Sequence, residues 1–375
     1  MTEENNSKKI SGDDKFTRRF YILNTCVTIL LLAAIFISIN QFGGEAWHGK
    51  KQIALILPGE RNNLGWYRSQ YVAMKNVCNE MDYELVVREN IPMDYDSCKK
   101  VVEDLAKRGV SNIYFTNGCR ISDMRAFEKV YPQISFCTIE IISAVGDFGR
   151  CSILSFEGYY IAGILAGLHT KTNKVGYIAP YTNSEVNLGI NAFTLGVKKA
   201  NPNAEILLNW TNTWDEPSKE EQAVQNLKAA RVDVLSYHEN RETIPKAAKS
   251  AGIFFISYNE VYPENNYCLG SVRIDWMTVY RELLKYKALH ITNIGYTLGV
   301  GSRVVDFEIS NYATIREKVA VETAKVELRN NRIIFQGEIF DRNGIKKCSA
   351  NESMSLQNLN EHSDWLIKGV NIIGN

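Results

Sequence analysis

The sequence predicts an α/β protein of two doubly wound lobes with a cleft between them, preceded by one N-terminal transmembrane helix. Apolar runs of strand length alternate with helical stretches along most of the 375 residues. This alternation is typical of parallel sheets whose strands are joined by right-handed helical crossovers. It occurs in two comparable sets, which indicates two lobes, and a single uncharged apolar segment precedes both.

The uncharged segment covers residues 20–40. A helix of that length spans about 31 Å, close to the hydrocarbon thickness of a bilayer. Basic residues at the end of the polar segment 1–19 place that segment in the cytoplasm and the main body outside. A cleaved signal peptide is the alternative, but no small-x-small cleavage site follows the run. Residues 41–51 are expected to form a linker.

The first set of elements begins with 52–58, a continuous apolar run that suits a parallel strand covered on both faces. Lobe 1 is expected to cover 52–160 together with parts of 270–375. Its further strands are expected at 83–90, 111–118, 133–140 and 151–156, and its helices near 66–82, 96–108 and 122–131.

The second set is expected to form lobe 2, residues 161–270. It follows a helix with Gly163 and Gly167, whose apolar run is too short to span a membrane and whose glycines indicate close packing against a sheet. The last part of the chain, including 332–344, reads as a terminal hairpin. Strands of lobe 2 are expected at 174–180, 205–212, 232–239 and 253–260, and helices at 186–200, 218–230 and 242–251.

Composition argues against several classes of protein. The net charge of +1 provides no strong field for nucleic acid, so we expect no nucleic-acid partner. The five histidines and eight cysteines form no HExxH or CxxC pattern, and neither a GxSxG nor a Walker sequence occurs. We therefore expect no enzyme activity, metal or cofactor. Seven cysteines lie outside the apolar segment, and the sequence leaves open whether Cys78, Cys98 or any others pair.

Several predicted strands end in polar or aromatic residues. In open parallel sheets, ligands bind beyond the carboxyl ends of the strands, so a small-molecule site is expected at this edge. The residues concerned are Asn117, Glu140, Trp210, His238 and Asn259.

A long motif within 157–176 resembles the basic membrane protein family of ABC-transporter solute-binding proteins, which includes purine nucleoside receptors. Segments 191–227 and 337–370 resemble the family as well, so the likeness covers about 52–373. It implies a type I periplasmic-binding-protein fold, a purine-like nucleobase or nucleoside as ligand, and ABC permease and ATPase partners at the cell membrane. The matching residues of the first motif are Glu157, Gly158, Tyr160, Ala162, Gly163, Ala166, Gly167, Thr170, Lys171, Thr172, Lys174 and Gly176.

The resemblance also implies binding residues after the first strand. Asn63, Gly65 and Trp66 take the family's acidic, serine and aromatic positions. Trp66 at a loop-to-helix junction could stack on a flat ring, or it could pack inward as an ordinary helix residue. Asn63 in place of an aspartate adds hydrogen-bond donors to the site.

In the second lobe, Trp214 could complete a sandwich with Trp66 or anchor its own loop. His238 could read the edge of a heterocycle or be a structural histidine. Asn259 replaces an aspartate that the resemblance assigns to ribose hydroxyls, which weakens a nucleoside ligand relative to a nucleobase. The full predicted site is Asn63, Gly65, Trp66, Asn117, Glu140, Trp214, His238 and Asn259.

Two functions are consistent with these features. The first is the extracytoplasmic capture component of an ABC importer for a purine-like or other small heterocyclic solute. The second is a membrane-tethered sensor or regulator with the same fold, which the retained apolar segment favours.

Overall fold

The described residues of the computed structural model are 50–62, 65–141, 150–214, 216–239, 242–288 and 296–374, with 25, 27–31 and 33 nearer the N-terminus. The chain divides into two compact units, 1–51 and 52–375. The predicted cytoplasmic, transmembrane and linker segments fall largely outside the described residues. Of the helices that the structure does describe, none combines the length and apolar character needed to cross a membrane.

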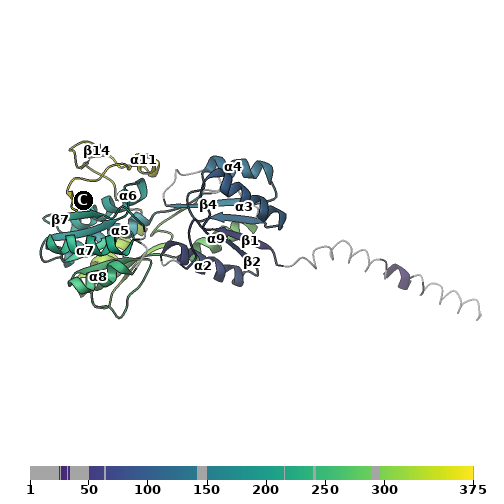
Figure 1. Cartoon of the computed structure of the whole chain (residues 1–375), viewed down its shortest axis with the longest axis horizontal. Helices are drawn as coiled ribbons and strands as arrows, with labels where there is room; N and C mark the ends of the chain where they lie inside the picture. The colour runs from purple at the N-terminus through teal and green to yellow at the C-terminus, as the bar shows by residue number, and fades with distance from the viewer. Residues whose placement is uncertain are drawn as a thin grey trace, which may run out of the picture. The chain divides into compact units, whose positions relative to one another are not determined.

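The first sheet has six strands in the order β11-β5-β4-β3-β1-β2, and every described neighbour pair is parallel. This sheet and its helices form lobe 1 (Figure 1). The strands are β1 (Gln52–Ile56), β2 (Glu84–Arg88), β3 (Asn112–Phe115), β4 (Ser135–Ile141), β5 (Arg150–Ile153) and β11 (Tyr296–Leu298); the helices are α2 (Trp66–Glu80), α3 (Tyr95–Lys107), α4 (Ile121–Val130) and α9 (Trp276–Ala288).

Both faces of this sheet are covered, which explains its continuous apolar strands. Ala54 and Ile56 of β1 pack with α3 and α4 in one core cluster. Ile53 and Leu55, which point to the opposite face, pack with α2 and α9 in another. Successive side chains of a strand point to opposite faces, so a doubly wound sheet needs apolar residues at consecutive positions.

The second sheet has seven strands in the order β12-β10-β9-β8-β6-β7-β15 and forms lobe 2. Its pairs are parallel except for β10 with β12. The strands are β6 (Lys174–Ala179), β7 (Glu205–Trp210), β8 (Val234–Tyr237), β9 (Phe254–Tyr258), β10 (Cys268–Ile274), β12 (Val305–Ile309) and β15 (Val370–Ile372); the helices are α5 (Ser155–His169), α6 (Ser184–Ala200), α7 (Pro217–Ala229), α8 (Thr243–Ala251) and α10 (Ile315–Arg329).

The C-terminal part of the chain forms the expected hairpin and also contributes strands to the sheet of lobe 2. A small antiparallel pair does form from β13 (Ile339–Phe340) and β14 (Lys346–Cys348), followed by α11 (Leu356–Glu361). However, β12 and β15 also join the sheet of lobe 2 at its two edges. Neither strand was among those expected from the sequence.

Gly163 and Gly167 of α5 pack against helix α6 and not against a sheet, which corrects the expectation from the sequence. A Cβ atom at Gly163 would lie 2.0 Å from the carbonyl oxygen of Phe193 on α6. A Cβ atom at Gly196 on α6 would lie 2.1 Å from the carbonyl oxygen of Tyr160 on α5. Glycine at both positions lets the two backbones approach this closely.

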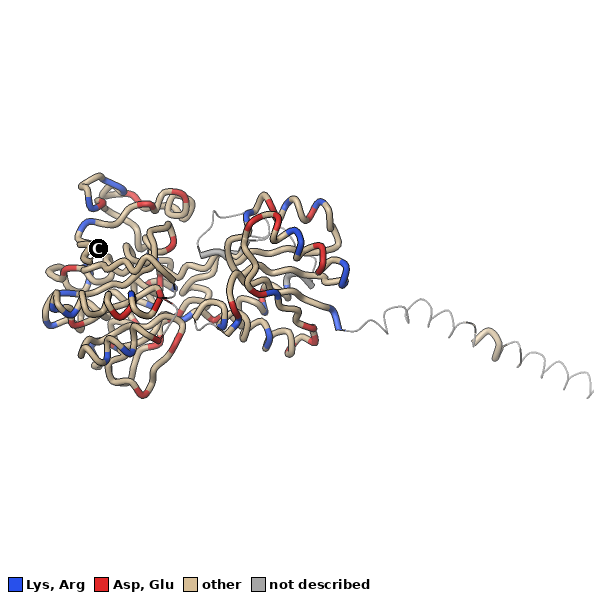
Figure 2. Tube along the Cα trace, viewed as in Figure 1, with Lys and Arg blue, Asp and Glu red and all other residues tan. Residues whose placement is uncertain are grey.

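The described chain passes between the two sheets three times: from β5 to α5, from β10 to α9, and from β11 to β12. Two of these crossovers are bonded together, because Glu157 Oε2 accepts a hydrogen bond of 2.6 Å from the Val300 amide. Burial raises the pKa of Glu157 to about 7. Charged side chains of both signs are distributed over both lobes (Figure 2).

Candidate functional site

A cleft of about 1070 Å³ lies between α2 of lobe 1 and the ends of β9 and β10 in lobe 2. Its wall is completed by the start of α9 and by β12. Its lining includes Arg68, Ser69, Asn259, Arg273, Trp276 and Asp306. The cleft therefore lies at a carboxyl edge of strands, where the sequence predicted a site.

Asn259 lies immediately beyond the end of β9 and lines this cleft. Its backbone has φ of 60°, a left-handed conformation that asparagine tolerates better than most residues. Its side chain is only 8% exposed, yet neither Oδ1 nor Nδ2 has a hydrogen-bond partner. The Tyr258 hydroxyl interacts with this amide but does not lie in hydrogen-bonding geometry with it.

Trp276, the first residue of α9, also lines the cleft. It is 3% exposed, and its Nε1 has no hydrogen-bond partner. A buried polar atom left unpaired costs about 1–3 kcal/mol, so such atoms require an explanation. Asn259 and Trp276 together place three such atoms in the walls of one cleft.

Trp66, the predicted stacking residue, lies beside the cleft and not in its lining. Its ring meets that of Trp276 edge to face at a centroid distance of 4.9 Å, and its Nε1 donates to the Thr116 carbonyl at 3.2 Å. Gly65 precedes it with φ of 92°, a conformation that only glycine adopts without strain. Trp66, which was predicted from the sequence, thus supports the cleft wall, whereas Trp276, which was not, lines the cleft.

Arg273 on β10 is a second lining residue that the sequence analysis missed. Its Nη1 donates to the backbone carbonyl of Asn259 at 3.1 Å. On the sheet it lies opposite Asp306 of β12. A single cation within the otherwise uncharged run 268–274 was the available signal.

His238 lies beyond the end of β8 and is almost fully buried, away from the lining of the cleft. Its Nδ1 is 2.7 Å from the Tyr177 hydroxyl, and its ring stacks on Tyr159 at 4.2 Å. Burial lowers the pKa of His238 to about 3, so the imidazole is neutral. These contacts support a structural role for His238.

Glu239 follows His238 and is likewise buried. Its Oε1 accepts a hydrogen bond of 2.7 Å from Thr211, while its Oε2 has no partner. Burial raises the pKa of Glu239 to about 8, and repulsion from the Glu220 carboxyl adds to the shift. Glu239 is therefore largely protonated at neutral pH and can donate a hydrogen bond.

The remaining predicted residues are scattered. Asn117 is exposed beyond β3, and Trp214 is 38% exposed in lobe 2. Glu140 lies on β4 with its backbone opposite Ser152, but its side chain is not among the described ones. Asn63 lies outside the described residues altogether.

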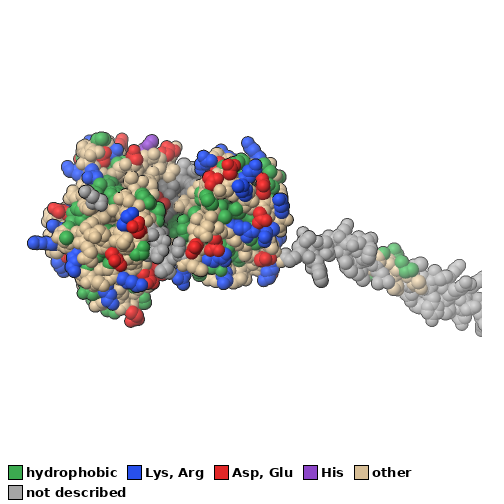
Figure 3. Space-filling model, in the orientation of Figure 1, with side chains coloured by type: hydrophobic (Ala, Val, Ile, Leu, Met, Phe, Trp, Pro, Cys, Tyr) green, Lys and Arg blue, Asp and Glu red, His purple; other side chains and the backbone are tan. Residues whose placement is uncertain are grey.

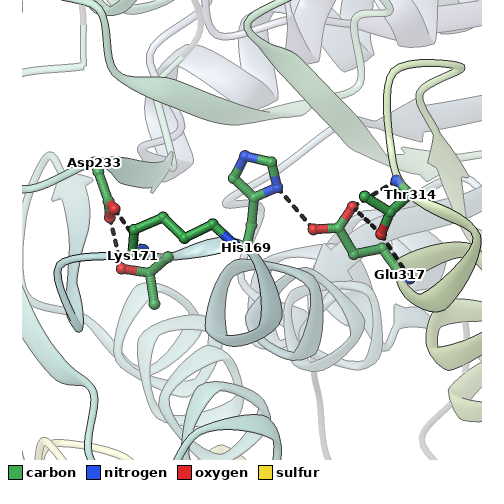
Figure 4. A network of polar contacts seen from close by, with 6 residues as sticks. His169, Lys171, Asp233, Thr314 and Glu317 are labelled. Atoms are coloured by element: carbon green, nitrogen blue, oxygen red, sulfur yellow. Dashed lines mark hydrogen bonds and ion pairs between the residues drawn. The ribbon is translucent and has the colours of Figure 1, made fainter.

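The polar end of the long 157–176 motif has a structural role (Figure 4). Asp233 accepts hydrogen bonds from the Thr170 hydroxyl at 2.6 Å and from the Lys171 amide at 2.6 Å. His169 Nδ1 lies 2.7 Å from Glu317 Oε1, and Glu317 forms a capping box with Thr314 at the start of α10. These bonds join the end of α5 to the sheet and to α10.

Within the described ranges, no group of three or more His, Cys, Asp or Glu side chains could hold a metal ion. On the face drawn in Figure 3, acidic and basic side chains are interspersed over both lobes. Charged, polar and aromatic side chains line the cleft together.

Two doubly wound lobes, three crossovers and a cleft at the strand ends define a two-lobed binding protein of the periplasmic type. Solved structures share this fold. A Conexibacter woesei ABC-transporter solute-binding protein matches with a TM-score of 0.63 and 16% identity over 75% of this chain and 97% of that one. A transcriptional activator of the comK gene from Bacillus halodurans matches with a TM-score of 0.64 and 17% identity over 75% and 99%.

Residues 50–341 match the family of PnrA-like ABC transporter substrate-binding proteins. The chain belongs to this family.

Among curated relatives, a Haloferax volcanii protein named as a candidate glucose-binding protein of an ABC transporter is 26% identical over 65% of this chain and 62% of its own length. A Brucella abortus purine-binding protein is 25% identical over 57% and 61%. The transcriptional activator Med of Bacillus subtilis is 24% identical over 61% of this chain and 72% of its own length. The chain thus spans about six-tenths of the first two relatives.

Proposed function

We propose that this protein is the extracytoplasmic solute-binding component of an ABC importer and that it captures a purine-like nucleobase or another small planar heterocycle. The observation that most supports this proposal is the set of unpaired polar atoms on Asn259 and Trp276 at the cleft. An amide offers donors and an acceptor, and an indole offers one donor. The edge of a nucleobase alternates donors and acceptors in the same way.

The chemistry of the cleft favours a ring without a sugar. The position that the family resemblance assigns to an aspartate is Asn259, so an acceptor-only carboxylate suited to ribose hydroxyls is absent there. Arg273 beside it is a donor only. At this position the amide and the guanidinium favour a planar ring with exposed acceptor atoms, while carboxylates such as those of Glu260 and Asp306 also line the cleft.

Closure of the two lobes by a hinge motion would complete the site. In this proposal Trp214 contributes an aromatic face, and Trp66 supports the cleft wall through its contact with Trp276. Asn63, Gly65, Asn117 and Glu140 contribute polar contacts around the ring, and His238 supports the framework behind them. The closed form would then present the solute to an ABC permease, whose ATPase drives transport.

A thermal-shift screen tests the proposal, because a ligand that binds only the folded state raises the melting temperature. The screen uses the full chain with nucleobases, nucleosides, sugars and amino acids. Stabilisation by a nucleobase supports the proposal. Stabilisation by a sugar or an amino acid alone would contradict it.

A second candidate, a membrane-tethered sensor, is supported by some relatives. Besides the Bacillus subtilis activator, a metabotropic glutamate receptor-like protein of Dictyostelium discoideum is 24% identical over 71% of this chain and 34% of its own length. Uptake of the solute distinguishes the two functions. Loss of uptake on deletion of the gene supports transport, whereas unchanged uptake with an altered transcriptional response to the solute supports sensing.

A further inference from the structure

Two buried cysteines of lobe 1 lie together near the ligand edge of its sheet. Cys98 is in the first turns of α3, and Cys119 is in the loop between β3 and α4. Each is 1% exposed, and both belong to the same core cluster. The two side chains interact with each other, and neither cysteine is in a disulfide in the structure.

Neighbouring contacts fix both segments that carry these thiols. The Cys98 thiol lies 3.7 Å from the Pro92 carbonyl oxygen, and the Cys119 thiol lies 3.9 Å from that of Arg120. A Cβ atom at Gly118 would lie 3.3 Å from Met93, so the loop packs directly on the segment before α3. The segment before Cys98 and the loop that carries Cys119 therefore pack against each other.

We propose that Cys98 and Cys119 are a modification site, at which oxidation forms an intramolecular disulfide that ties α3 to the ligand-edge loop of lobe 1. The bond would close a loop of about twenty residues, a length for which a cross-link markedly reduces the entropy of the unfolded chain. An extracytoplasmic location, as in the proposed function, would provide the oxidising environment in which such bonds persist.

The chemistry needs a disulfide oxidant, for which oxidised glutathione serves. The hydrogen bond from Cys119 lowers the pKa of Cys98, which favours its thiolate as the attacking group. The Cys98 thiolate attacks one glutathione sulfur and releases one thiolate; the Cys119 thiolate then attacks Cys98 Sγ and releases the second. Two protein thiols are oxidised, the oxidant is reduced to two thiols, and the two cysteine protons pass to the released thiolates.

The cross-link would act on the binding edge because of where Cys119 lies. Three residues earlier, the Thr116 carbonyl accepts hydrogen bonds from Trp66 Nε1 at 3.2 Å and from Gln70 Nε2 at 3.4 Å. A disulfide at Cys119 would thus hold the loop that supports the first turn of α2, one wall of the cleft. Amide hydrogen exchange over 116–120 should be slower in the oxidised protein.

Peptide mapping of the full chain tests the proposal. The reduced protein is exposed to oxidised glutathione, alkylated and digested with trypsin without reduction. We expect peptides 89–99 and 109–120 to be recovered linked, lighter than their sum by two hydrogen atoms. The link should be absent in Cys98→Ala and in Cys119→Ala but retained in Cys348→Ala, a control in β14. The oxidised wild type should melt about 4 °C above its reduced form.

Three outcomes would overturn the proposal. The first is recovery of 89–99 and 109–120 as separately alkylated peptides. The second is a link from either peptide to another cysteine. The third is a stable mixed disulfide of glutathione on Cys98, which would mean that Cys119 cannot reach it. These measurements need no ligand, so their result does not depend on whether the protein binds a heterocycle.

Discussion

Arg273 Nη1 donates to the backbone carbonyl of Asn259 at 3.1 Å, so the end of β9 is bonded to a side chain of the neighbouring strand β10. This bond fixes the backbone at Asn259 in its left-handed conformation while the amide above it has no partner. In the proposed function, this bond holds the strand end in place for a solute. A preorganised site of this kind loses little conformational entropy on binding.

Two tryptophan-to-phenylalanine variants separate a ligand contact from a structural one. Trp276→Phe removes an indole N–H that has no partner, so the ligand-free melting temperature should change little while ligand affinity falls about tenfold. Trp66→Phe removes the bond to Thr116, so stability should fall by about 1 kcal/mol with a smaller effect on affinity. Calorimetry and thermal melts measure both effects. The reverse pattern would place Trp66 at the ligand and Trp276 in the framework.

Glu239 should make stability depend on pH. Its folded pKa of about 8 lies above the ordinary 4.5, so the folded protein holds the proton more tightly and the wild type loses stability as pH rises between these values. Glu239→Gln lacks this effect. The stability of the variant relative to wild type should rise with pH by up to about 1.4 kcal/mol per pH unit.

Urea unfolding at about pH 5 and about pH 8 measures this difference. Exposed Glu205→Gln is the control, for which the difference from wild type should be the same at both pH values. A constant difference for Glu239→Gln as well would mean that the carboxyl is ionised throughout.

The packing of α5 on α6 should tolerate no side chain at Gly163. A Cβ atom there would meet the Phe193 carbonyl oxygen at 2.0 Å, so Gly163→Ala must displace one of the helices. We expect a loss of about 3 kcal/mol in the free energy of unfolding. Gly301→Ala, where a Cβ atom would meet nothing within 4 Å, should have little effect. Equal stabilities in urea melts would contradict this packing.

The N-terminal segment gives a prediction that is independent of the cleft. If residues 20–40 are a signal-anchor, the expressed protein should remain in the membrane fraction and resist extraction by high salt and alkali. Its N-terminal sequence should begin at or next to Met1. A mature N-terminus near residue 41 would show that the segment is a cleaved signal peptide.

The alternation of strands and helices could be predicted from the sequence because both faces of a doubly wound sheet are covered, so a strand such as β1 contains consecutive apolar residues. The strand ends followed from the same runs, which is why Asn259 was found. The direction of a side chain beyond a strand end has no such signal. The sequence therefore left both roles of His238 open, whereas the structure shows its bond to Tyr177. Trp276 lines the cleft but was not among the predicted residues.

Isothermal titration calorimetry with a nucleobase and its nucleoside, side by side, tests the central claim most directly. We expect wild type to bind the base at least tenfold more tightly than the nucleoside, a difference of about 1.4 kcal/mol. Asn259→Asp, which provides a carboxylate acceptor, should shift the preference toward the nucleoside. Equal or reversed affinities for wild type, or no binding of either compound, would contradict the assignment of this cleft to a sugar-free heterocycle.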